Sequence, residues 1–281
     1  MQIEIVPCGV ALGAQIRGVN LARPLEDAAF REVEAAFDEH GVLVFRDQTI
    51  TPAQQIEFGR RFGELLPNFN SEVHGVAGHP ELFVVSNIEE EGRPIGARRV
   101  GETWHSDMSY AARPPRATLL HALEIPELHG LTLGDTEFAN AAAAYDALPD
   151  AMQQRIESLQ GVFDFRGRTR ARGVSEEVAR RYPPVMHPIV RTHPRTGRKS
   201  LYVMRGDCTG IVDMEAGKAQ ALIAALAEHI VRPEFVYRHR WQRGDVVMWD
   251  NCTVQHKALI DYDLPQRRLI HRTTIAGPAP A

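Results

Sequence analysis

A histidine and a carboxylate two positions apart, in the segment Trp104-His105-Ser106-Asp107, constrain the fold of this chain more than any other feature. On an extended strand, residues two apart point to the same side, so His105 and Asp107 can bind one metal ion together. The best candidate for a third ligand, His256, follows about 150 positions later, and only a fold that closes distant strands around a common interior can bring it to the pair. A closed β-fold is therefore expected.

Two histidines and one carboxylate suit non-haem Fe(II) and oxygen chemistry, because three ligands on one face of the metal leave the opposite face open. Each part is weak alone. A His-x-Asp pair often arises by chance, and a single histidine such as His256 is more often a buried, hydrogen-bonded side chain. The argument depends on the combination, since several sites of matching chemistry follow one another along the chain.

Two arginines near the end of the chain supply positive charge for small acidic molecules. Within residues 267–272, Arg268 and Arg272 share one face if the segment is a strand. A guanidinium donates two parallel hydrogen bonds to a carboxylate, so both are candidates for binding acids. The alternative is a solvated strand face, which we assign to Arg267. Thr136 can add its hydroxyl to the carboxylate that Arg268 binds, although alone it only favours β-structure.

Composition and charge are those of an ordinary globular chain of 281 residues, 44% of them apolar. The net charge of −4 at pH 7 gives no general attraction to nucleic acid or to an anionic membrane. No run of about 18 apolar residues predicts a membrane span, and the first residues lack the basic start of a signal peptide. Cys8, Cys208 and Cys252 form no C-x-x-C pair, which predicts free thiols in a reducing, cytoplasmic compartment.

Short apolar segments dominate the chain and predict a mainly β fold with helical additions. Strands and helices do not alternate in a βαβ rhythm, so a jelly roll with helices packed outside is expected. The predicted strands cover residues 2–6, 10–19, 42–45, 82–85, 116–125, 134–138, 161–166, 185–192, 199–204, 234–241, 244–250 and 268–276. The predicted helices cover residues 27–39, 52–62, 140–147, 149–159 and 215–231.

A single domain over residues 1–281 is expected, with helical insertions at about 140–160 and 215–231. The region of about 64–103 has weak periodicity and precedes the metal motif directly. Long irregular segments inside a compact domain are usually lids or binding loops. We therefore expect this region to contact the substrate.

Six segments of the sequence carry a resemblance to a known family. They are Trp104-His-Ser-Asp, Gly134-Asp-Thr-Glu-Phe, Ala143-Ala-Tyr-Asp-Ala-Leu-Pro, Phe235-Val-Tyr-Arg-His-Arg-Trp, Asp245 to Asn251, and Leu264-Pro-Gln-Arg-Arg through Arg272. With these segments the chain resembles, over nearly its whole length, the family of taurine dioxygenase and 2,4-dichlorophenoxyacetate dioxygenase, which depend on Fe(II) and 2-oxoglutarate. The connection from Pro126 to Gly134 is a few residues longer than is usual there.

The resemblance implies a double-stranded β-helix and an iron ion held by His105, Asp107 and His256. It also implies that Thr136 and Arg268 bind the distal carboxylate of 2-oxoglutarate.

For the primary substrate, the resemblance implies that Arg272 faces an acidic group, and Asn70 and His74 in the loop region are further substrate-binding candidates. The expected reaction uses Fe(II), 2-oxoglutarate and O2 to hydroxylate a small organic acid, with release of succinate and CO2. If the hydroxylated carbon bears a heteroatom, the product then fragments. A homo-oligomer, dimer or tetramer, is expected, with neither nucleic acid nor membrane as a partner.

Two other functions fit part of the pattern. A zinc-dependent hydrolase can use two histidines and one carboxylate, but it gives no role to Arg268 and has no evident general base beside the ligands. A non-catalytic metal-binding jelly-roll protein needs neither an open metal face nor a site for a co-substrate. Oxygen uptake with 2-oxoglutarate separates the three.

Overall fold

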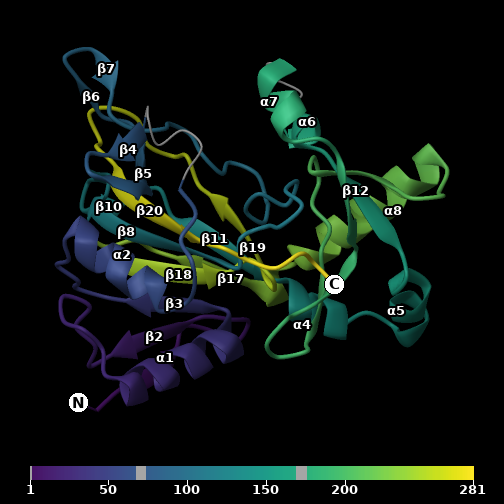
Figure 1. The fold of residues 1–281 in the computed structure, drawn as a ribbon, viewed down its shortest axis with the longest axis horizontal. Helices are drawn as coiled ribbons and strands as arrows, with labels where there is room; N and C mark the ends of the chain where they lie inside the picture. Colours follow the sequence, from purple (N-terminus) through teal and green to yellow (C-terminus); the bar gives the residue numbers. More distant parts are fainter. Residues whose placement is uncertain (1, 68–73, 169–175) are drawn as a thin grey trace.

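The computed structural model describes residues 2–67, 74–168 and 176–281. An eight-stranded sheet, in the order β1-β2-β3-β18-β8-β20-β5-β4, is its largest part (Figure 1). Neighbouring strands are antiparallel except β2 and β3, which are parallel. The strands are β1 Glu4–Pro7, β2 Ala14–Arg17, β3 Val42–Phe45, β4 Gly75–Val76, β5 His79–Ser86, β8 Ala117–Glu124, β18 Val246–Asp250 and β20 Leu269–Ile275.

The central strands of this sheet are buried on both faces, and alternate residues enter different cores. In β3, Leu43 and Phe45 pack in a core with residues of helices α1 (Asp27–His40) and α2 (Pro52–Arg60). Val42 and Val44 point the other way, into a second core. Because successive side chains of a strand point to opposite faces, one face of the sheet packs against the helices. The other face is free of these helices and is available for the functional residues.

A smaller antiparallel sheet packs on that second face. Its order is β17-β11-β19, with β17 at Val236–His239, β11 at Thr136–Asn140 and β19 at Val254–Ala258. Phe138 of β11 packs in one core with Val247 and Trp249 of the large sheet. The two sheets therefore face each other across a shared interior.

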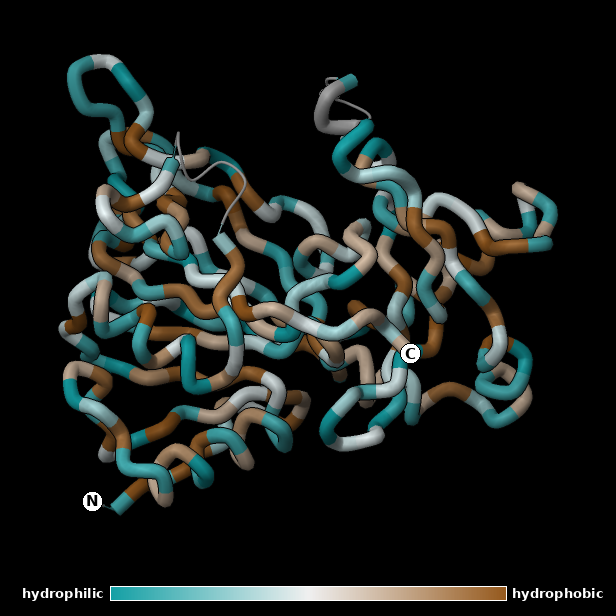
Figure 2. Tube along the Cα trace, in the orientation of Figure 1, coloured by the Kyte–Doolittle hydropathy of each residue, from teal (hydrophilic) through white to brown (hydrophobic). Residues whose placement is uncertain are grey.

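Helices α4, α5 and α8 gather at the far end of the molecule around a third core, whereas the β6–β7 hairpin projects beside the large sheet (Figure 1). In Figure 2 the core strands carry hydrophobic colours, whereas the projecting β6–β7 hairpin is hydrophilic. No helix in the described part of the chain is both long and apolar enough to span a membrane.

The helices outside the large sheet are α4 Ala141–Asp146, α5 Asp150–Ile156, α6 Phe165–Arg168, α7 Glu176–Arg181, α8 Ala216–Ile230 and the 3-10 helix η1 Pro233–Phe235. The strands are β6 Glu89–Glu90, β7 Arg93–Pro94, β9 Glu127–Leu128, β10 Leu131–Thr132, β12 Gln160–Phe163, β13 Val185–Pro188, β14 Val190–Thr192, β15 Lys199–Leu201 and β16 Cys208–Ile211.

The helices predicted from sequence are present within a few residues of their expected ends. Several predicted strands are wrong in part: the strand at 10–19 covers only Ala14–Arg17, the strand at 199–204 ends at Leu201, and residues 234–235 belong to a 3-10 helix. The strand at 161–166 stops at Phe163, because Asp164 accepts a hydrogen bond from the backbone of Arg166 and starts α6. The strand at 185–192 is two strands, since the chain passes at Ile189 from the sheet of β12 to a pairing with β15.

Candidate active site

Three side chains from distant parts of the chain converge in the shared interior. The ligand atoms of His105, Asp107 and His256 all lie within 4.8 Å of one another, and the three residues are buried. Asp107 Oδ1 is 3.6 Å from His105 Nε2 and 3.8 Å from His256 Nε2. These separations are too long for direct hydrogen bonds, and they leave room for one ion bonded to all three atoms.

Backbone pairing brings the two histidines together. His105 and His256 form an isolated antiparallel bridge, with N–H to carbonyl bonds of 3.1 and 2.8 Å. The extended strand expected for the 105–107 pair is wrong at Asp107, which lies in a turn that continues through Met108 at φ 45°. A left-handed backbone at such a residue costs about 1–2 kcal/mol. The turn, and not strand alternation, places the Asp107 carboxylate beside the imidazoles.

Hydrogen bonds decide which atoms His105 and Asp107 present. The Nδ1 of His105 lies 2.7 Å from the carbonyl oxygen of Thr103, so Nδ1–H donates and the Nε2 lone pair faces the other ligands. The hydroxyl of Thr118 donates to Asp107 Oδ2 at 2.6 Å, which leaves Oδ1 on the side of the histidines. Two imidazole nitrogens and one carboxylate oxygen form a donor set that fits Fe(II).

Arg272 of β20 places a positive charge against this group. Its Nη2 lies 3.1 Å from Asp107 Oδ1. Burial raises the pKa of the Asp107 carboxyl, but Arg272, followed by His256 and His105, lowers that pKa well below its ordinary value. The carboxylate is therefore ionised and able to bind a cation. A metal held by Asp107 Oδ1 would compete with Arg272 for that oxygen.

A second arginine is held mainly by aromatic rings. Arg268 is buried, with its guanidinium carbon 6.0 Å from the ring centre of Trp241 and 5.3 Å from that of Tyr262. Its Nη1 donates to the carbonyl of Gly134 at 2.7 Å. A Cβ at Gly134 would lie 2.3 Å from that nitrogen, and its φ is 76°, so glycine is required on two grounds.

Thr136 and Arg268 both contact Trp241. The Nε1–H of Trp241 donates to Thr136 Oγ1 at 3.0 Å. Because the indole can only donate, the hydroxyl of Thr136 keeps its own hydrogen for another acceptor. Sequence reasoning gave Trp241 no role of its own, although it ends the segment Phe235-Val-Tyr-Arg-His-Arg-Trp, because its partner Thr136 is 105 residues away.

The predicted substrate residues are placed in part. His74 precedes β4, and its ring lies 5.9 Å from that of Phe83, the residue of β5 that pairs with Arg272. Within the described part of the chain, the buried Nδ1 of His74 has no hydrogen-bond partner. Asn70 lies outside the described residues.

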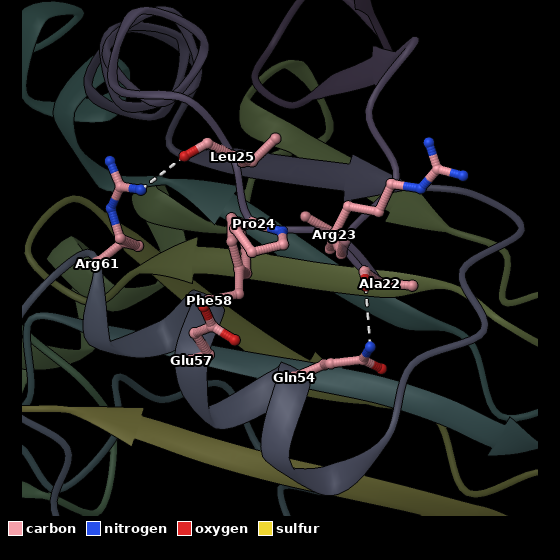
Figure 3. A pocket seen from close by; sticks show the side chains of 9 residues that line it. Ala22, Arg23, Pro24, Leu25, Gln54, Glu57, Phe58 and Arg61 are labelled. Atoms are coloured by element: carbon pink, nitrogen blue, oxygen red, sulfur yellow. Dashed lines mark hydrogen bonds between the residues drawn. The ribbon is translucent and has the colours of Figure 1, made fainter.

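A hollow against α2 is separate from this site (Figure 3). Arg61 and Gln54 of the α2 region donate across it to the carbonyls of Leu25 and Ala22. The hollow lies on the face of the large sheet that the helices cover. Gln55 of α2 donates a hydrogen bond to Thr273 of β20, and the side chain of Thr273 points to the opposite face of the sheet from that of Arg272. Its lining residues are Leu21, Ala22, Arg23, Pro24, Leu25, Gln54, Glu57, Phe58 and Arg61.

A second buried group, His193, Asp250 and Cys252, also places its ligand atoms within 4.8 Å. Here the atoms are bonded to each other and to the backbone. His193 Nε2 lies 3.1 Å from Asp250 Oδ2, and its Nδ1 accepts from two backbone N–H groups at 3.0 and 3.2 Å. Asp250 accepts from Cys252 N and from the hydroxyl of Thr253, each at 2.8 Å. This group is a closed hydrogen-bonded cluster.

Comparisons with known proteins agree with the geometry. Residues 4–274 match the family described as taurine catabolism dioxygenase TauD, TfdA family. The α-ketoglutarate-dependent 2,4-dichlorophenoxyacetate dioxygenase of Cupriavidus pinatubonensis is 34% identical over 99% of both chains. The alkylsulfatase of Acinetobacter baylyi is 33% identical over 98% of this chain and 86% of its own.

Solved structures show the same fold. A taurine dioxygenase from Burkholderia xenovorans matches with a TM-score of 0.83 and 33% identity, over 100% of this chain and 93% of its own. The structure of AAD-2 with Mn(II) and N-oxalylglycine matches with a TM-score of 0.82 and 34% identity, over 100% and 99%. The cofactors of such enzymes are Fe(II), 2-oxoglutarate and O2. The chain belongs to the TauD/TfdA family of 2-oxoglutarate-dependent dioxygenases.

Proposed function

We propose that this protein hydroxylates a small organic acid, a carboxylate or a sulfonate, with conversion of 2-oxoglutarate and O2 to succinate and CO2. The observation that carries the proposal is the convergence of His105, Asp107 and His256 beside a cationic side chain, Arg272. Relatives are named for acids of this kind, including 2,4-dichlorophenoxyacetate and sulfonates. Both atoms of O2 are accounted for, since one enters the substrate and the other enters succinate.

In this proposal His105, Asp107 and His256 hold Fe(II), which supplies the activation of O2 when bound. The protein contributes position and the exclusion of water. Trp249 supports this role, because its buried ring lies 4.5 Å from that of His256. Low exposure around the ligands also strengthens the electrostatic attraction between Asp107 and the cation.

Arg268 and Thr136 are proposed to bind the distal carboxylate of 2-oxoglutarate. Arg268 has a buried Nε without a hydrogen-bond partner in the described chain, and the hydroxyl of Thr136 is oriented to donate. A carboxylate that accepts from both gains charge-assisted hydrogen bonds in a site shielded by Trp241 and Tyr262.

Arg272 and His74 are proposed to bind the acidic substrate, together with Asn70. Arg272 already pairs with an anionic oxygen, and His74 lies across Phe83 from it. The hydroxylated product would fragment if the attacked carbon carries an oxygen or sulfur substituent, and one relative is named for sulfate esters.

Several broader features belong to the same proposal. We infer that the two facing sheets form a double-stranded β-helix, or jelly roll, within one domain over residues 1–281. The shared core between β11 and the large sheet supports this arrangement. We also infer a cytoplasmic homo-oligomer, dimer or tetramer, that binds neither nucleic acid nor membrane. The free thiols Cys8, Cys208 and Cys252 support a reducing compartment, and light scattering tests the assembly.

The test is O2 uptake and succinate release with Fe(II) and 2-oxoglutarate across a panel of small carboxylates, sulfonates and sulfate esters. Succinate release that depends on one class of acid supports the proposal. Bound Fe(II) without succinate release for any acid contradicts it and favours a hydrolytic or non-catalytic metal protein.

Two variants assign the arginines. Arg268→Ala should raise the 2-oxoglutarate concentration needed for half-maximal turnover by at least about tenfold while Fe(II) affinity changes little, since the loss of one buried charge-assisted contact is worth more than 1.4 kcal/mol. Arg272→Ala should weaken dependence on the acid more than on 2-oxoglutarate. The control is Arg267→Ala, because Arg267 is exposed and paired with Glu124.

A further inference from the structure

The amide of Asn251 has one orientation, fixed by groups that can only donate hydrogen bonds. Its Oδ1 lies 3.1 Å from Trp249 Nε1 and 3.2 Å from the backbone nitrogen of Asp107. An indole N–H and a backbone N–H cannot accept, so the atom between them must be the amide oxygen. The Nδ2 of Asn251 therefore occupies the other position, 3.1 Å from Thr118 Oγ1.

That orientation decides the direction of the next hydrogen bond. The Nδ2 donates to Thr118 Oγ1, so the hydroxyl has its single hydrogen available for another acceptor. The acceptor at 2.6 Å is Asp107 Oδ2. The hydrogen bonds thus run in one direction, from Asn251 through Thr118 to the metal-facing carboxylate.

The three residues of this hydrogen-bonded chain are almost completely buried: Thr118 is 0% exposed, Asn251 1% and Asp107 3%. Water therefore does not compete for these hydrogen bonds, and a buried polar network of this kind is rigid when every member is satisfied. The backbone of Asn251 is held as well, because its carbonyl accepts from the hydroxyl of Ser106 at 2.8 Å.

We propose that Thr118 and Asn251 are positioning residues that restrict Asp107 to binding the metal through Oδ1 alone. Oδ1 is the oxygen near both imidazoles, whereas Oδ2 is occupied by the Thr118 hydroxyl. With one carboxylate oxygen bound, a six-coordinate ion held by the three residues would have three further positions for a chelating keto acid and O2. With both carboxylate oxygens bound, it would have two. This inference rests on the proposed function of the site.

The experiment uses the full chain loaded with Mn(II), which takes the same nitrogen and oxygen ligands and does not react with O2 in this site. Thr118→Val keeps the shape of the side chain and removes the hydroxyl. Two quantities are measured. The first is the separation between the antisymmetric and symmetric carboxylate stretching frequencies, taken from the infrared difference spectrum between metal-bound and metal-free protein. The second is the affinity for N-oxalylglycine, measured by calorimetry. Neither depends on turnover.

Thr118→Val should narrow the separation of the stretching frequencies, as a carboxylate that chelates through both oxygens does. It should weaken N-oxalylglycine binding by at least about tenfold, within the 10–100-fold range of such outer contacts, because the freed Oδ2 would occupy one of the positions that the chelator otherwise uses and would have to be displaced. Thr118→Ser restores the donor and should restore both values. Asn251→Asp should reproduce the valine variant, although the hydroxyl remains, because the new carboxylate attracts the hydrogen of Thr118 away from Asp107.

Wild-type binding mode and affinity in both Thr118→Val and Asn251→Asp would overturn the positioning role while leaving the proposed function intact. A wild-type chain that binds neither Mn(II) nor N-oxalylglycine would contradict the proposed function itself, and the positioning role with it. If only one of the two variants folds, its values alone decide between these outcomes.

Discussion

The two buried histidine–aspartate groups of this protein differ in what their atoms face. In the group of His105, Asp107 and His256, the facing atoms are 3.6 and 3.8 Å apart, and the outer atoms of His105 and Asp107 are bonded elsewhere. In the group of His193 and Asp250, the facing atoms are 3.1 Å apart. The first group has space between its facing atoms, and the second is closed by its own hydrogen bonds. Residue type and proximity alone do not distinguish them, whereas the direction of the hydrogen bonds does.

The same substitution in each group tests this difference most strongly. His256→Ala should lower Mn(II) affinity by more than about 100-fold, beyond the range of outer contacts. His193→Ala should leave Mn(II) affinity unchanged and lower the free energy of unfolding by about 3 kcal/mol, because the buried carboxylate of Asp250 loses its partner. Metal titration and urea unfolding measure the two effects. A loss of metal binding in His193→Ala would mean that the second group also holds an ion.

Metal-linked stability sharpens the comparison. Mn(II) at 100 times its dissociation constant should raise the free energy of unfolding of the wild-type protein by about 2.7 kcal/mol. Mn(II) should add the same free energy of unfolding to His193→Ala, although this variant is less stable without the metal. It should add none to His256→Ala. Thermal unfolding with Mn(II) and then with a chelator provides the measurement. An increment that survives in His256→Ala would place the ion elsewhere.

Two glycines offer a matched pair of smaller changes. Gly101 and Gly197 have φ of 81° and 70°, so alanine at either costs about 1 kcal/mol of stability from the left-handed backbone. A Cβ at Gly101 would lie 3.1 Å from His105 Cε1, whereas at Gly197, in the turn after His193, nothing lies within 4 Å. Gly101→Ala alone should therefore weaken Mn(II) binding, by about tenfold. Equal metal affinity in the two variants would show that the imidazole tolerates the contact.

Acid should weaken the closed group slightly. Burial raises the pKa of Asp250, but His193, the backbone of Cys252 and Thr253 together hold it below its ordinary value of 3.8. Between the ordinary pKa of 3.8 and the lower pKa in the folded protein, the unfolded chain binds more protons than the folded one. The free energy of unfolding therefore falls as the pH drops through this window. Urea unfolding between pH 5 and pH 3 should show a steeper loss in wild type than in Asp250→Asn. Parallel curves would contradict this role.

The convergence of His105, Asp107 and His256 was predictable from residue type and order along the chain. His105 and Asp107 are close in sequence, and His256 follows in a segment that resembles the family. The cluster of His193 was not predictable, since its partner Asp250 is distant in sequence and no spacing links them. Thr118 and Asn251 were missed for a similar reason. A threonine in a strand and an asparagine after an aspartate look like ordinary strand and turn residues until the chain is folded.

The strands of the fold were predictable where they are long or strongly apolar, as in β8 and β18. The two-residue hairpins β6–β7 and β9–β10 were not, because so few residues carry no periodicity. Periodicity also missed β19, which follows the turn at Asp250 and carries His256. Its polar residues are buried by their pairing with β11 and not by an apolar pattern.

Strand β20 lies between β8 and β5, yet it is made last among the strands, and it carries Arg272. At translation speeds of about 5–20 residues per second, the ribosome has built most of the scaffold before β20 exists. The nascent chain thus bears His105 and Asp107 for some time without their cationic and imidazole partners. The group around Asp107 therefore assembles only after the last strand of the large sheet has been made.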